Sequence, residues 1–145
     1  MRFAIGCDHA GLLLKGTLAQ HLREQGHQVQ DFGTDTPASC DYADFAAAVA
    51  RAVAAGEADQ GLLVCGTGVG MSMAANKVHG VRAAVVSDTF SARATRQHND
   101  ANVLCMGERV VGPGLALDIL DAWLGASFEG GRHQRRIDKI MALEA

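Results

Sequence analysis

The chain has 145 residues, of which 48% are hydrophobic and 20% charged, and its formal net charge is −3 at pH 7. These values predict one folded domain over residues 1–145 and exclude a disordered or fibrous chain. The charge gives no field that would gather nucleic acid or an anionic membrane, and we expect neither a signal peptide nor a membrane span, because every apolar run is too short.

The first part of the chain predicts two strands and two helices. Residues 2–7 form a short apolar run that is typical of a buried strand, and residues 27–32 alternate loosely as a second one. Leucines recur every four residues across 11–25 and predict an amphipathic helix. A polar loop leads to a second helix over 42–55, which Asp41 or its neighbours can cap.

The rest of the chain alternates in the same way. Residues 61–65 are an apolar run that ends in a glycine turn. In the helix expected over 88–98 we place Phe90 on the core side, and in the helix over 112–125 we place Leu115 there. The further expected elements are strands at 81–87 and 102–106 and helices at 71–78 and 131–143, the last of them basic.

Strands that alternate with helices of this length predict an α/β fold with a parallel sheet. We expect a single Rossmann-like three-layer domain, in which a five-stranded parallel sheet carries helices on both faces and a basic helix follows at the C-terminus. Ligands of such sheets bind at the carboxyl ends of the strands. The residues predicted at that edge are Asp8, His9, Cys65 to Gly70, Ser87, Asp88, Gly107 and Arg109.

The glycine turn after Cys65 directs several backbone N–H groups and the start of a helix toward one point, which suits an anion. A thiol beside these donors is favoured as the thiolate. The spacing of Gly66, Gly68 and Gly70 is not a dinucleotide fingerprint, and Met71 stands where a cysteine phosphatase needs an arginine. A tight turn with a buried packing thiol is the alternative interpretation.

Two polar groups lie outside this turn. His98 and Asn99 end a predicted helix, where they are either caps or, for the histidine, a general acid or base. Arg132 and Arg136 share one face of the last helix, as a solvated basic face or as a phosphate clamp. We see no lysine placed for a Schiff base and no carboxylate or histidine cluster placed for a metal. The four cysteines lack metal-binding spacing and indicate reduced thiols in a cytoplasmic protein.

Six segments together resemble the ribose-5-phosphate isomerase B family, which includes allose-6-phosphate isomerases and galactose-6-phosphate isomerase subunits. The resemblance runs nearly from end to end, and the segments follow the family's order. They are CDHAG at 7–11, DYADFA at 41–46, CGTGVGMSMAANKV at 65–78, GVRAA at 80–84, RQHNDANVLCMGER at 96–109 and FEGGRHQRRIDKI at 128–140.

The resemblance implies a metal-free, cofactor-free aldose–ketose isomerase that acts through an enediolate in the pentose phosphate pathway. It implies a homodimer or a dimer of dimers with active sites shared between subunits. By this likeness Cys65 is the base that moves the proton, and His98 opens the sugar ring with Thr67 nearby. The substrate-binding residues that it implies are Asp8, His9, Tyr42, Gly66, Gly68, Val69, Gly70, Asn99, Arg109, Arg132 and Arg136, the last two at the phosphate.

Other functions stay open at this stage. Ala43 replaces a proline that is often seen in the family, in the loop beside the sugar, so a hexose 6-phosphate is an alternative to ribose 5-phosphate. A non-catalytic phosphosugar-binding module needs the turn and the arginines but no base. An interaction protein that uses the basic tail helix needs only Arg132 and Arg136.

Overall fold

The computed structural model of the protein describes residues 1–144. Its strands are β1 (Arg2–Cys7), β2 (Gln28–Asp31), β3 (Gln60–Cys65), β4 (Ala83–Val85) and β5 (Val103–Gly107). Its helices are α1 (Leu12–Glu24), α2 (Tyr42–Ala54), α3 (Val69–Ala75), α4 (Thr89–Asn99), α5 (Pro113–Leu124) and α6 (Arg132–Met141), followed by a short 3₁₀ turn, η1 (Ala142–Glu144).

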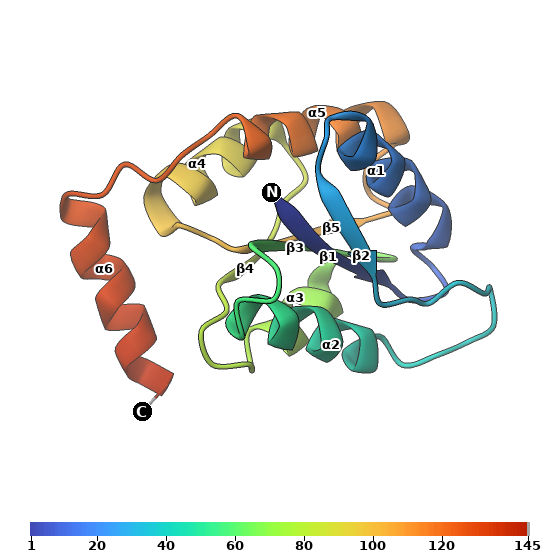
Figure 1. The fold of residues 1–145 in the computed structure, drawn as a ribbon, viewed down its shortest axis with the longest axis horizontal. Coiled ribbons are helices and arrows are strands. Elements are labelled where there is room, and N and C mark those ends of the chain that lie inside the picture. Colours follow the sequence, from blue (N-terminus) through green and yellow to red (C-terminus); the bar gives the residue numbers. More distant parts are fainter. Residues whose placement is uncertain (145) are drawn as a thin grey trace.

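The five strands form one sheet in the order β2-β1-β3-β5-β4, and every neighbouring pair is parallel. Helices α1, α4 and α5 cover one face of the sheet, while α2 and α3 cover the other (Figure 1). All six residues of the central strand β3 are buried, as its continuous apolar sequence predicts for a strand covered on both faces. The predicted α/β architecture is therefore confirmed.

Each face of the sheet has its own core. On one side Leu18 and Leu22 of α1 pack with Ile119 and Trp123 of α5, and on the other α2 and α3 pack over β3. The Trp123 indole N–H needs an acceptor when it is buried, and it donates to Oε1 of Gln60 at the start of β3 over 2.7 Å. This bond fixes α5 across the sheet.

Three sequence expectations were wrong in detail. Phe90 is 72% exposed and Leu115 is 42% exposed, because Ala92 and Ala116 occupy the core-facing positions of these helices. The strand expected at 81–87 is only three residues long, since β4 is an edge strand with a single neighbour.

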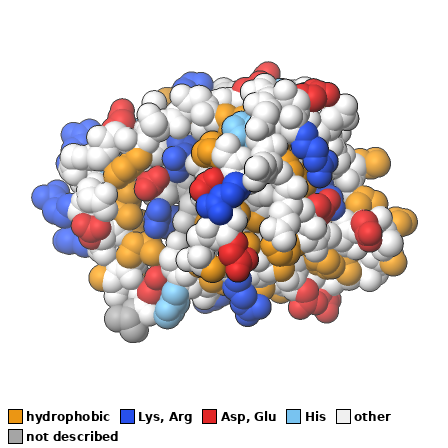
Figure 2. All heavy atoms as spheres, viewed as in Figure 1, with side chains coloured by type: hydrophobic (Ala, Val, Ile, Leu, Met, Phe, Trp, Pro, Cys, Tyr) orange, Lys and Arg blue, Asp and Glu red, His pale blue; other side chains and the backbone are white. Residues whose placement is uncertain are grey.

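The last helix lies apart from the sheet and contacts α4 (Figure 1). Ile137 is its one buried residue, and its cationic side chains give the end of the molecule where α6 lies a cluster of Lys and Arg (Figure 2). Within residues 1–144, no helix combines the length and the apolar character that crossing a membrane requires.

Candidate active site

A cavity of about 450 Å³ opens at the carboxyl ends of β1 and β3. The two strands are adjacent and in register, with Cys7 opposite Val64, so that the residues following each strand meet at one place. The cavity is lined by Asp8, His9, Ala10, Tyr42, Cys65, Gly66, Thr67, Val69, Gly70, Met73 and Arg109. Nine of the predicted site residues are therefore brought together.

The glycine turn places a donor on the cysteine. Gly68 has φ +81°, which glycine adopts readily, and a Cβ there would lie 2.9 Å from the backbone carbon of Met106. In this conformation the Gly68 N–H donates to Sγ of Cys65 over 3.1 Å. Helix α3 therefore begins at Val69, two residues earlier than predicted, and Gly68 supports the site from behind the cavity wall.

Cys65 is distinguished from the two other buried thiols by its place at the cavity. Burial raises the pKa of Cys7 to about 11, and burial together with the neighbouring Cys65 raises the pKa of Cys105. These two thiols stay protonated at neutral pH. Cys65 is 5% exposed, and that exposed part faces the cavity.

Polar groups surround the cysteine at fixed positions. Asp8 is buried, and its Oδ1 accepts the Ala10 N–H over 2.9 Å, which orients the carboxylate. The Tyr42 ring packs on Gly70, where a Cβ would come within 2.5 Å of the ring. The Arg109 side chain lies over Gly66, where a Cβ would make only an ordinary contact with it at 3.6 Å, and the Arg109 backbone N–H donates to the Gly66 carbonyl over 3.0 Å. The absence of a side chain at Gly70 therefore lets the Tyr42 ring approach the backbone.

His9 connects the cavity to the loop before α2. Its Nδ1 accepts the Cys40 N–H over 3.3 Å, and the Cys40 sulfur lies 3.9 Å from the same nitrogen. This bond leaves Nε2 of His9 for a ligand. Ala10 and Met73 line the cavity, and Cys40 contacts His9 from the loop; nothing in the sequence spacing of these three residues distinguishes them as site neighbours.

The remaining predicted residues lie elsewhere in the described chain. His98, Asn99, Arg132 and Arg136 do not line the cavity of Cys65. Helix α4 ends before β5, and the Asn102 carbonyl accepts the Gly61 N–H at the start of β3. His98 is thus at the amino edge of the sheet, whereas Cys65 is at the carboxyl edge. Six residues of β3 separate the two edges by about 17 Å.

The end of α4 is held firmly. Asp100 ends the helix in a left-handed conformation with φ 45°. Arg96 donates to its carboxylate over 2.9 Å, and Arg82 donates to its backbone carbonyl over 2.8 Å. These contacts define the position from which His98, two residues earlier, projects.

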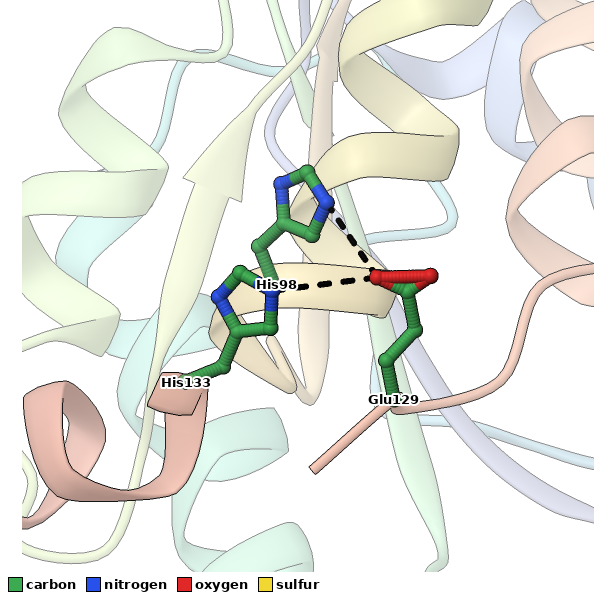
Figure 3. A group of neighbouring side chains, drawn as sticks. All are labelled: His98, Glu129 and His133. Carbon is green, nitrogen blue, oxygen red and sulfur yellow. Dashed lines mark ion pairs between the residues drawn. The ribbon is translucent and has the colours of Figure 1, made fainter. Parts of the chain in front are cut away.

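His98 has two neighbours that the sequence analysis did not identify. Its Nε2 lies 3.4 Å from Oε1 of Glu129, and Nε2 of His133 lies 3.7 Å from the same oxygen (Figure 3). The two imidazole rings stack with centroids 4.4 Å apart. We expected no cluster of carboxylate and histidine side chains placed for a metal, and the structure brings these three ionisable side chains together. Glu129 and His133 are four residues apart, but His98 joins them only through the packing of α4 against α6.

Comparison with known proteins places this geometry in a family. A sequence model described as Ribose/Galactose Isomerase matches residues 3–140. Ribose-5-phosphate isomerase B of Escherichia coli is 55% identical over 99% of this chain and 96% of its own length.

Solved structures that resemble this chain belong to the same group of proteins as the sequence relatives. Ribose-5-phosphate isomerase B of Clostridium thermocellum has a TM-score of 0.98 at 54% identity and covers 99% of this chain and 97% of its own. The Mycoplasma genitalium protein, solved with bound ribulose-5-phosphate, has a TM-score of 0.95 at 48% identity, with 99% and 95% of the two chains covered. The chain therefore belongs to the Ribose/Galactose Isomerase family and is an isomerase.

Proposed function

We propose that the protein interconverts ribose 5-phosphate and ribulose 5-phosphate through an enediolate, without a metal, as a homodimer whose subunits share each active site. The observation that carries this proposal is the separation of the predicted site into two halves. One half is the cavity of Cys65, and the other is the end of α4 together with α6. A second copy, related by a twofold axis, supplies the missing half to each cavity. The whole chain forms one isomerase domain in this proposal.

The reaction starts with the closed sugar ring. His98 of one subunit takes the proton of the ring hydroxyl at C1 and returns a proton to the ring oxygen, while Thr67 and Asp8 of the other subunit bind the sugar hydroxyls. Asp8 suits this role because its carboxylate is buried and already oriented by the Ala10 N–H. The open aldehyde then lies beside the cysteine.

Cys65 is the base that moves a proton between two carbons. Its thiolate removes the proton from C2, the electron pair moves toward the C1 oxygen, and the thiol then returns a proton to C1. The proton of the C2 hydroxyl passes to the C1 oxygen, so that atoms and charge balance and no redox cofactor is consumed. The Gly68 N–H supports the thiolate.

The enediolate carries negative charge next to the glycine turn. The first N–H groups of a helix have no acceptor within the helix, and here they belong to Val69 and Gly70 at the cavity wall. The Val69 N–H bonds to Oγ1 of Thr67, which leaves the Gly70 N–H to face a ligand. A preorganised donor of this kind contributes about 3 kcal/mol to catalysis in other enzymes.

The phosphate is bound by cations from both subunits. Arg109 lies over the glycine turn of one subunit, and Arg132 and Arg136 extend from the exposed face of α6 of the other. Guanidinium groups match phosphate oxygens with paired donors. The free thiols of the cysteines agree with a reducing, cytoplasmic compartment, which we include in the proposal.

Subunit mixing tests the shared site. We expect Cys65→Ala and His98→Asn homodimers to be inactive, each for a different half-site. In a heterodimer of the two variants, one active site has both lesions and the other has none. After subunit exchange of an equal mixture, about one quarter of the native activity on ribose 5-phosphate should return.

A matched control uses two lesions in the same half-site. Cys65→Ala mixed with Thr67→Val leaves every heterodimer site damaged and should recover no activity. Failure of the Cys65→Ala and His98→Asn pair to recover, with exchange verified by differently tagged chains, contradicts the shared site. If the native chain is inactive on ribose 5-phosphate but isomerises allose or galactose 6-phosphate, the sugar is wrong and the chemistry stands.

A further inference from the structure

The cluster of His98, Glu129 and His133 has the composition of a cation site. The two imidazole nitrogens approach one carboxylate oxygen at 3.4 and 3.7 Å, and all the candidate ligand atoms lie within 4.8 Å of one another (Figure 3). Donors that share a tetrahedral Zn²⁺ at the usual bond lengths of about 2.0–2.2 Å are about 3.4 Å apart. The spacing of these atoms is therefore close to that of a zinc ligand set, and rotation of the two stacked rings is the movement that binding requires.

The backbone holds the three side chains together. The Glu129 N–H donates to the Gln97 carbonyl over 3.0 Å and so fixes the chain before α6 beside the last turn of α4. Gly131 then turns the chain with φ 58°, and α6 begins, so that His133 lies in its first turn. The site thus connects two helices and the segment between them.

We propose that His98, Glu129 and His133 bind one Zn²⁺ ion and that this ion inhibits the enzyme. Two imidazoles and a carboxylate are a ligand set that zinc takes in open sites, with a fourth position left for water. Mg²⁺ and Ca²⁺ prefer oxygen ligands and are poorly matched to two nitrogens. To bind, the two rings rotate out of their stacked arrangement, so that the ion lies in the plane of each ring.

The charges around the cluster have opposing effects. Burial and the nearby His98, Arg132 and Arg136 lower the pKa of His133, while Glu129 raises it. The same arginines repel a cation, and the Glu129 carboxylate offsets one of these charges.

Inhibition rests on the proposed function. If His98 transfers the proton that opens the sugar ring, a cation on its Nε2 removes the nitrogen that does so. The carboxylate and the second imidazole supply the affinity, but they have no assigned part in the reaction. Cation binding and isomerase activity can therefore be measured separately.

Binding is measured first, on the full chain after treatment with chelator. We expect one Zn²⁺ per chain by calorimetry, and a Co²⁺ spectrum without a thiolate-to-metal charge-transfer band. Glu129→Gln and His133→Gln should each weaken binding at least about tenfold. Glu129 is exposed, so its amide variant should fold normally, and circular dichroism checks this.

Two controls exclude other ligands. Cys65→Ala should bind the ion as the native chain does. His21→Gln removes another histidine–carboxylate pair, with Nε2 of His21 2.7 Å from Oδ1 of Asp121, and should also leave binding unchanged. Absence of binding, binding that survives both cluster variants, or a thiolate band in the Co²⁺ spectrum overturns the site.

The activity measurement separates this proposal from the preceding one. Zn²⁺ should inhibit the native enzyme, and the inhibiting concentration should rise at least about tenfold in Glu129→Gln, relative to that variant's own metal-free rate. If the cluster binds Zn²⁺ stoichiometrically and the rate stays unchanged, the inhibitory part of the proposal is overturned, whereas the role of His98 in the reaction is decided by the activity of His98→Asn.

Discussion

The Gly68 N–H donates to Sγ of Cys65 over 3.1 Å, across a turn of three residues. The bond depends on the left-handed conformation of Gly68, whose φ is +81°. Chain conformation and the surroundings of the thiol are therefore linked at this point, because the residue that turns the backbone also provides a donor to the sulfur that we propose as the base. Both members of the pair can be tested separately.

The cysteine is tested by its removal. Cys65→Ala should lower kcat on ribose 5-phosphate by about 10²–10⁴, the usual contribution of a positioned acid–base group, with a small change in KM. Cys40→Ser is the matched control, because it removes a thiol that lies 3.9 Å from Nδ1 of His9 and leaves the glycine turn unchanged. A kcat for Cys65→Ala equal to the native value would show that another group moves the proton.

Substitution of Gly68 by alanine tests the turn, because it adds a methyl group there. Gly68→Ala should lower the free energy of unfolding by about 1–3 kcal/mol, because the backbone is left-handed there and the new Cβ meets Met106 at 2.9 Å. Gly16 lies exposed within α1, and a Cβ added there would meet no atom within 4 Å, so Gly16→Ala should instead stabilise by about 0.5–1 kcal/mol. Urea unfolding of both variants measures these changes. Equal changes in the free energy of unfolding would contradict the strain argument.

The sequence predicted most of the fold because its signals are local. The buried run of β3 and the leucine spacing of α1 define their elements without help from the rest of the chain. Phe90 was misplaced because residue type alone does not fix which face of a short helix is inward. Its 72% exposure follows from Ala92 being the residue that fits against the sheet.

The sequence predicted the part of the site that lies at one edge of the sheet. The ends of β1 and β3 are adjacent, so Asp8 and Cys65 meet wherever a parallel sheet forms. The cluster around His98 depends instead on how α6 packs on α4, a contact between segments with no shared periodicity. Only the spacing of Glu129 and His133, four residues apart near a helix start, was visible as a signal.

Removal of metal ions tests whether the proposed proton transfer proceeds without a metal. The reaction that we propose uses a thiolate, an imidazole and backbone donors, so kcat should be unchanged after exhaustive treatment with chelator. If trace Zn²⁺ occupies the His98 cluster before treatment, its removal should raise the rate. A loss of activity that returns on adding a divalent cation would contradict the metal-free mechanism.

Acid should weaken the start of α4, which carries His98 at its other end. The Asp88 carboxylate accepts the Ser91 N–H over 2.6 Å, and this bond holds the pKa of that carboxyl below its ordinary value of 3.8. A lowered pKa stabilises the fold above that value, and the contribution is lost as the pH falls through the lower folded pKa.

Asp88→Ala should therefore lower the urea midpoint at pH 7, and the difference from the native chain should narrow progressively below pH 3.8. Asp35, in an exposed loop, serves as the control, and its alanine variant should track the native midpoint at both pH values. A difference at Asp88 that is the same at pH 7 and in acid would mean that the carboxylate charge does not stabilise the helix.

The bond between Trp123 and Gln60 gives the sharpest test of the core. Trp123→Phe leaves the buried acceptor of Gln60 unpaired, and Gln60→Met leaves the buried donor of Trp123 unpaired. Each variant should therefore lower the free energy of unfolding by about 1–3 kcal/mol. The smaller ring of Trp123→Phe also leaves a cavity, which lowers it further. In the double variant neither polar group remains unpaired. Its loss of unfolding free energy should therefore be smaller than the sum of the two single losses, by about 1–2 kcal/mol in urea unfolding. Additive losses would mean that the 2.7 Å contact contributes nothing beyond packing, and that α5 is held on the sheet by apolar contacts alone.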